Sequence, residues 1–159
     1  MCYNFKPAPL DKVAQFITFS TLFLMGVLTW FSWVDKIFFV FLIWIPLLVV
    51  LLFVPPGYSI TGQDILIKRL LSNIIIDGAE IQAVEAVEKP DIGLRVWGSG
   101  GFFGYLGIFR LGNGYASLYC TRLKNILLIK TRKRNYLISP DDPREFLSKW
   151  QSTRKNTGN

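Results

Sequence analysis

Two long apolar runs constrain the fold of this chain more than any other feature. Residues 13–34 and 37–54 contain no charged side chain, and each run reaches the roughly 18–20 apolar residues that a helix needs to cross a membrane. A soluble hairpin would need a large apolar partner surface, which the remaining residues do not supply. A cleaved signal peptide does not fit either, because a second apolar run follows the first. The sequence therefore predicts a transmembrane hairpin of two antiparallel helices joined at residues 35–36.

Basic residues around the hairpin predict its orientation. They are Lys6 and Lys12 before the first run, Lys36 in the turn, and Lys68 and Arg69 after the second run. This distribution favours cytoplasmic termini, because Lys and Arg accumulate in cytoplasmic segments. The two cysteines form no C-x-x-C motif, and unpaired thiols fit a reducing compartment. We therefore expect a multi-pass protein of the cell inner membrane with both termini in the cytoplasm.

After the hairpin, the apolar residues fall into short segments that are separated by turns. These segments span 58–61, 64–70, 73–76, 81–87, 104–111, 115–121, 125–130 and 134–139. Gly62-Gln63 and Asn113-Gly114 are typical of tight turns between strands. Seven or eight short strands with such turns predict an antiparallel sandwich or barrel rather than alternating β-α-β units.

The end of the chain carries the signature of one helix, expected at residues 143–151. Asp142 can cap its first turn, and Glu145 three residues later completes a capping box. Phe146 and Trp150 then lie on one face at helical spacing. We expect this apolar face to close an open end of the sheet, with Trp150 in the core.

Strands followed by one closing helix follow the plan of the pleckstrin-homology (PH) superfold. The segments YSITGQDILIKR, GLRVWGSGGFFGYLGIFRL and ISPDDPREF resemble the membrane-anchored bacterial PH-like domain proteins over about residues 57–152. The resemblance implies a mainly-β PH-like barrel or roll closed by a C-terminal helix, behind a pair of transmembrane helices. It supplies no mechanism, because the family is largely of undefined function. The expected organisation is a tail (1–12), the hairpin (13–56), the PH-like domain (57–152) and a polar tail (153–159).

Basic residues are candidates for contact with anionic lipid. In PH domains that bind phosphoinositides, the basic ligands surround the loop between the first two strands. The resemblance places that loop at residues 61–64, which hold an acid and no base. Charge contacts would instead come from Lys130, Arg132, Lys133 and Arg134. The alternative is that these residues form an ordinary solvated face.

The stretch from residue 93 to residue 114 holds eight of the thirteen glycines. A nucleotide-binding G-x-G-x-x-G motif is excluded, because the motif that begins at Gly98 has Phe103 in its last position. Glycines at bends of small barrels are the structural explanation, with a loop at about 88–101 that opens into a bent strand. The functional interpretation is an exposed tip at which Trp97, Phe102 and Phe103 contact a partner or the membrane.

Nothing in the sequence predicts catalysis. The chain has no histidine, Asp141 and Asp142 fit helix capping, Ser99 has no base partner, and Cys120 fits a buried strand. We expect no catalytic residue, cofactor, metal or nucleic-acid partner. The predicted function is non-enzymatic binding or scaffolding through a partner protein or a second copy. The alternatives are binding of anionic headgroups or a small amphiphile, and a role as an accessory subunit of a transport or secretion complex.

Overall fold

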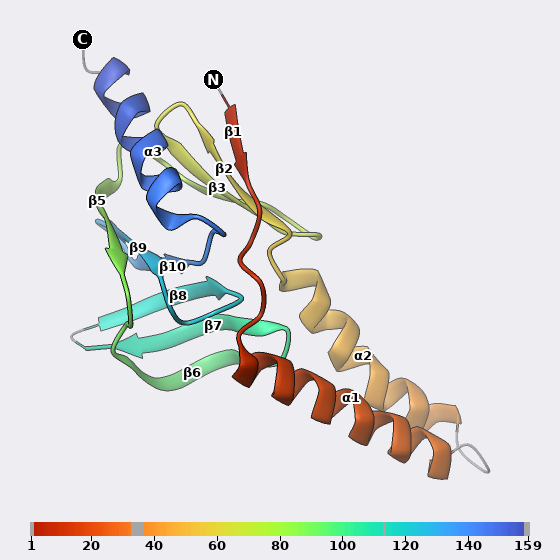
Figure 1. Cartoon of the computed structure of the whole chain (residues 1–159). Coiled ribbons are helices and arrows are strands. Elements are labelled where there is room, and N and C mark those ends of the chain that lie inside the picture. Colours follow the sequence, from red (N-terminus) through yellow and green to blue (C-terminus); the bar gives the residue numbers. More distant parts are fainter. Residues whose placement is uncertain (1, 33–36, 113, 158–159) are drawn as a thin grey trace.

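A computed structural model describes residues 2–32, 37–112 and 114–157. Two neighbouring helices, α1 (Lys12–Ser32) and α2 (Ile37–Phe53), project from one side of a β domain, and α3 (Pro143–Thr157) packs on another side (Figure 1). Trp44 Nε1 donates a hydrogen bond to Thr29 Oγ1 at 3.0 Å, which joins the two projecting helices. The turn expected at residues 35–36 lies outside the described residues.

The described residues form ten strands in two sheets. The first sheet has the order β1-β2-β3-β4, with β1 (Cys2–Phe5), β2 (Gly57–Thr61), β3 (Asp64–Lys68) and β4 (Ile74–Ile76). The second has the order β5-β9-β10-β8-β7-β6, with β5 (Ile81–Val87), β6 (Ile92–Gly101), β7 (Gly104–Leu111), β8 (Gly114–Cys120), β9 (Ile126–Thr131) and β10 (Asn135–Ile138). The mainly-β domain with a C-terminal helix is therefore as expected.

Several details of the expected fold were wrong. The β8–β10 pair is parallel, because β10 fills the gap between the opposed strands β8 and β9 and must run parallel to one of them. The segment 88–101 is not a loop, since most of it is strand β6, paired with β7 along its length. The expected N-terminal tail contains β1, which pairs with β2. Helix α3 continues to Thr157, beyond the expected end at residue 151.

One core cluster lies between the two sheets and α3. Phe146 and Trp150 of α3 are buried in it, together with residues of β2, β3, β9 and β10. Trp150 Nε1 donates to the carbonyl of Gln63 at 3.3 Å, so its polar atom also has a partner. Asp142 Oδ1 accepts from the amides of Arg144 and Glu145 at 2.9 and 3.0 Å. The predicted cap of this helix and the core position of Trp150 are thus confirmed.

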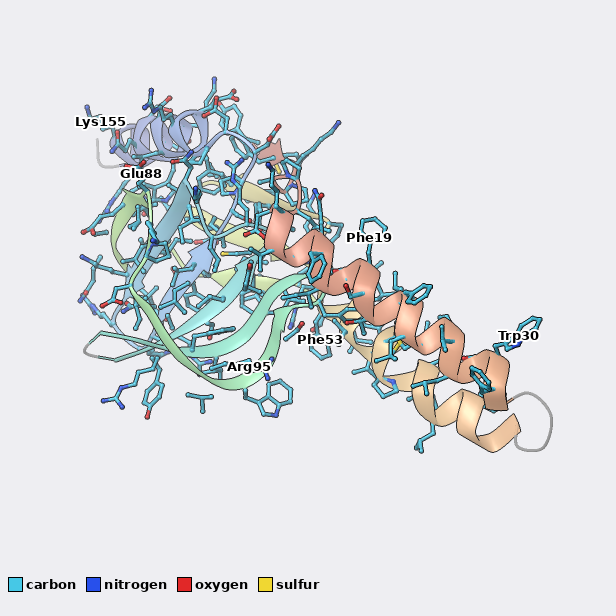
Figure 2. All side chains as sticks on the ribbon, turned by 60° about the horizontal axis from the view of Figure 1, so that its bottom comes forward. Phe19, Trp30, Phe53, Glu88, Arg95 and Lys155 are labelled. Carbon is cyan, nitrogen blue, oxygen red and sulfur yellow. The ribbon has the colours of Figure 1, made fainter. Side chains whose placement is uncertain are left out.

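A second core cluster lies on the other face of the six-stranded sheet. It contains Tyr105, Phe109, Leu118 and Cys120 of β7 and β8, and Ala14 of α1. The first turns of α1 therefore belong to the folded domain. Beyond them, large side chains such as Phe19 and Trp30 point outward (Figure 2).

Within the part of the chain that the structure describes, one helix (Lys12–Phe31) is long and apolar enough to cross a membrane by length and composition. The described apolar stretch of α2, Trp44–Phe53, is shorter. A spanning hairpin of two helices therefore stays a prediction.

Candidate functional site

A groove of about 970 Å³ opens between the second half of α2 and one face of the six-stranded sheet. The four-stranded sheet covers β9 and β10 on this face, whereas β6, β7 and β8 remain open beside it. Alternation along β7 directs Leu106 and Ile108 toward the groove and Tyr105 and Phe109 toward the second core. The apolar lining is Ile45, Val49, Val50 and Phe53 of α2 and Val96, Trp97, Leu106 and Ile108 of the sheet.

Two paired glycines form part of the groove floor. Gly98 of β6 lies opposite Gly107 of β7, with φ values of 114° and 126° that side chains rarely adopt. A Cβ atom on either residue would collide with the backbone of the other strand. Gly104 also has a positive φ, and a Cβ there would lie 2.6 Å from the carbonyl oxygen of Cys120. These glycines serve close strand pairing, as the structural interpretation of the glycine-rich stretch proposes.

Three arginines from separate segments line the groove: Arg69 after β3, Arg95 in β6 and Arg134 before β10. Arg69 is held in place, because its Nε and Nη2 donate to the carbonyl and hydroxyl oxygens of Ser72 at 2.7 and 2.9 Å. Its guanidinium lies 5.5 Å from the ring centroid of Phe53 and 5.7 Å from that of Tyr119. Figure 2 shows Arg95 and Phe53 on the same side of the β domain.

The groove carries positive charge without an internal counter-charge. Its lining holds no Asp or Glu, and no ion pair to Arg95 or Arg134 occurs among the described residues. Burial raises the pKa of Tyr119, and the charges of Arg69 and Arg134 pull that pKa in the opposite direction. An apolar groove with unpaired guanidinium groups favours an anionic ligand with an apolar part.

The predicted basic turn does not act as one cluster. Lys130 and Lys133 pair with glutamates of β5 and of the turn before it, at 2.7 and 2.6 Å, and Arg132 is exposed. The hydrogen bond to its glutamate raises the pKa of Lys133. Of the four basic residues, Arg134 alone lines the groove.

The predicted aromatic tip is also divided. Trp97 has 70% of its surface exposed and lines the groove. Phe102 and Phe103 lie at the β6–β7 turn, half-buried and edge to face with centroids 4.7 Å apart. Thr18 of α1 fixes this turn, since its Oγ1 accepts from the Phe103 amide at 3.0 Å and donates to the Gly101 carbonyl at 3.4 Å.

Asp11 fixes α1 to the β domain. Its Oδ1 accepts from the Ala14 amide at 2.8 Å and from the Tyr105 hydroxyl at 3.3 Å, and its Oδ2 accepts from the Leu123 amide at 3.3 Å. Burial, followed by the charge of Asp11, raises the pKa of Tyr105 to about 12. Asp11 is not among the predicted functional residues, although an Asp before an apolar run is a helix-cap signal. Arg69 and Arg95 are not among the predicted site residues either, because no local pattern in the sequence marks them.

Comparison with known proteins identifies the domain. Residues 57–153 match the family described as bacterial PH domain. The chain belongs to the bacterial PH domain family. It is also 31% identical over 90 residues to an uncharacterised protein of Clostridium acetobutylicum, a match that covers 54% of this chain and 30% of that protein. The chain thus spans less than a third of that relative's length. No solved structure matches the chain.

In this bacterial PH domain the loop between the first two strands of the matched region does not form the groove. That loop joins β2 and β3, and its acidic residue is Asp64. The Oδ1 atom of Asp64 accepts a hydrogen bond from the Gly78 amide at 2.8 Å. The carboxylate therefore serves the fold, and the cationic groove lies at a different place. Membership of the bacterial PH domain family suggests a binding or scaffolding role.

Proposed function

We propose that this bacterial PH domain protein is anchored in the inner membrane and binds a ligand at the cytoplasmic surface without catalysing a reaction. In this proposal α1 and α2 both span the bilayer, both termini are cytoplasmic, and the groove is the binding site. The supporting observation is the double character of α1. Its residue Ala14 is buried in the second core, whereas Phe16, Phe19 and Phe23 expose 70–75% of their surface. Lipid would cover this surface, because large apolar patches are costly in water.

The lining of the groove supports binding rather than catalysis. Among the described lining residues there is no carboxylate, thiol or imidazole, and the Ser99 hydroxyl donates to the Phe102 carbonyl at 2.9 Å. Tyr119 also lines the groove, but burial raises the pKa of its hydroxyl, which therefore stays protonated and is a poor general base at neutral pH. Anchoring would also allow the domain to bind ligands of low affinity, since a tethered domain meets membrane-surface ligands at an effective concentration of about millimolar.

Extraction and labelling of cysteine test the anchoring and the orientation. We expect the full chain to stay in the membrane fraction after washing at alkaline pH. Cys2 is exposed and Cys120 is buried, so an impermeant maleimide should label Cys2 in inverted vesicles and not in spheroplasts. A Cys2→Ser/Lys36→Cys chain is the matched control and should show the opposite pattern. Release of the chain by the wash, or labelling of Cys2 from outside, would contradict the proposal.

A scaffolding role through a partner protein or a second copy is the second candidate. It is favoured by Leu70, Leu71 and Ile75, which expose 65–69% of their surface around the β3–β4 connection. A cysteine introduced as Ile75→Cys in a Cys2→Ser chain should then form a specific crosslink in intact membranes. An Asp91→Cys chain is the control, and equal crosslinking of both would argue against docking at this surface.

A further inference from the structure

We propose that the groove binds one anionic membrane phospholipid, with its phosphate on Arg69, Arg95 and Arg134 and an acyl chain against α2. This inference rests on the proposed function, because the lipid would enter from a bilayer that surrounds α2. It differs from the site expected at residues 130–134, which would contact headgroups only through surface charge.

The charge of the groove selects an anion. Three arginines line the groove, one from β6, one directly after β3 and one directly before β10, and the lining contains no acid. The guanidinium of Arg69 is already oriented by Ser72 and by the Phe53 and Tyr119 rings. Arginine binds phosphate oxygens through two parallel hydrogen bonds, so a guanidinium that is already held in place, as that of Arg69 is, favours a phosphate group. The neighbouring lysines are paired with glutamates and add little to this preference.

The apolar walls of the groove select an amphiphile over a free anion. Ile45 and Val49 of α2 face Trp97 and Ile108 of the sheet across it. A free phosphate would occupy the arginines and leave these walls in water. An acyl chain would cover them, because burial of its methylene groups removes apolar surface from water.

The groove is continuous with the apolar surface of α2, which favours a lipid over a peptide. Ile45 and Val49 both line the groove and expose about half of their surface, and Leu48 and Leu52 beside them are also exposed. An acyl chain can therefore follow α2 out of the groove into the bilayer without crossing a polar rim. A soluble acidic peptide would have to enter the membrane region to reach the same wall.

Lipid retention by the full chain tests this inference. The chain is reconstituted in nanodiscs of equal parts phosphatidylglycerol and phosphatidylcholine, extracted in mild detergent, and its bound lipid is measured by native mass spectrometry. We expect retained phosphatidylglycerol, reduced about tenfold or more in an Arg95→Gln/Arg134→Gln variant, because two charged hydrogen-bond donors are lost. Both side chains are exposed, so the variant should keep the unfolding temperature of the wild type.

The matched control removes the same charge elsewhere. A Lys130→Gln/Lys133→Gln variant should keep the bound phosphatidylglycerol, because its lysines lie outside the groove lining. Equal losses in both variants, or no loss in either, would overturn the inference. Addition of glycerol phosphate separates the two sources of phosphate. Displacement of the lipid by about equimolar glycerol phosphate would indicate a site for a free anion and would also overturn it.

Failure of the two proposals can be distinguished. A chain that resists the alkaline wash but retains no phosphatidylglycerol keeps the proposed anchoring and refutes the lipid site. A chain that the wash releases refutes the anchoring itself.

Discussion

The two faces of the six-stranded sheet differ in how they are covered. On one face, Tyr105, Phe109 and Cys120 are buried beneath the start of α1 and the N-terminal segment. On the other face, Ile108 and Tyr119 of the same two strands border the groove. Both faces carry apolar side chains, so their composition does not explain the difference. What differs is whether another element closes the face.

The covering elements are attached in different ways. Asp11 and Thr18 join α1 to the β domain by hydrogen bonds from several side-chain and backbone groups. In the described ranges no hydrogen bond connects α2 to the β domain, and the guanidinium of Arg69 over the Phe53 ring bridges them instead. The face next to α1, which is hydrogen-bonded to the β domain, forms a buried core. The face next to α2, which has no such hydrogen bonds, forms a groove. The binding site is therefore a part of the sheet whose packing is incomplete.

The largest expected effect is a difference in stability between substitutions at two adjacent residues of β7, which point to opposite faces of the sheet. Phe109 is 5% exposed and Ile108 is 37% exposed. Phe109→Ala should lower the free energy of unfolding by about 3–5 kcal/mol, because it leaves a cavity in the second core. Ile108→Ala should cost about 1 kcal/mol, since the groove already exposes it. Urea unfolding of the full chain in detergent measures both, and similar losses would show that the groove face is packed like a core.

Much of the fold could be predicted from local patterns. The capping box at Asp142, the apolar face of α3 and most strands follow from spacing within about ten residues. Strand β6 was missed because glycines lower strand propensity, and the reason for Gly98 is Gly107 on the neighbouring strand. The parallel β8–β10 pair was not predicted, because no local sequence pattern indicates that β10 inserts between β8 and β9.

The candidate site was harder to predict than the fold. Arg69, Arg95 and Arg134 are far apart in the sequence, and only the sheet topology places all three in the lining of one groove. The run of basic residues at 130–134 drew attention because it is local, yet two of its lysines are paired with glutamates. Trp97 was selected for its exposure in a glycine-rich stretch, and it does line the groove.

The glycine pair beneath the groove gives the next prediction. A Gly107→Ala variant places a Cβ against the backbone of Trp97 and Gly98 at a φ of 126°. We expect a loss of about 3 kcal/mol in unfolding free energy from strain and overpacking. Gly112→Ala is the control, because its φ is 44° and no atom lies within 4 Å of the added Cβ. It should cost about 1 kcal/mol. Equal losses of unfolding free energy in the two variants would mean that β6 and β7 can move apart to accommodate a Cβ atom at residue 107.

Removal of the α1 attachment should have a smaller effect. Asp11→Ala deletes a helix cap and the acceptor for the Tyr105 hydroxyl and the Leu123 amide. We expect a loss of about 2 kcal/mol, because a cap and charged hydrogen bonds are lost together. Asp91→Ala, a change at an exposed acid, should leave the unfolding temperature unchanged. If the Asp11→Ala variant is as stable as the wild type, the hydrogen bonds of Asp11 do not explain why α1 closes one face of the sheet whereas α2 leaves the other face open.

The smallest expected effect tests whether the closed face excludes water at alkaline pH. Burial raises the pKa of the Cys120 thiol from its ordinary value of 9.0 to about 12. The thiol is therefore protonated in the folded chain at about pH 10, whereas it ionises in the unfolded chain. This contribution to stability is complete below about pH 9 and is lost as the pH rises toward 12, with about 1.4 kcal/mol lost at pH 10. Urea unfolding at pH 7 and pH 10 should show a pH-dependent loss that is smaller by that amount in Cys120→Ala. Cys2→Ala, at an exposed thiol, should keep the full loss. An identical pH dependence in all three chains would mean that Cys120 ionises in the folded state, and that the face beneath α1 is as open to water as the groove.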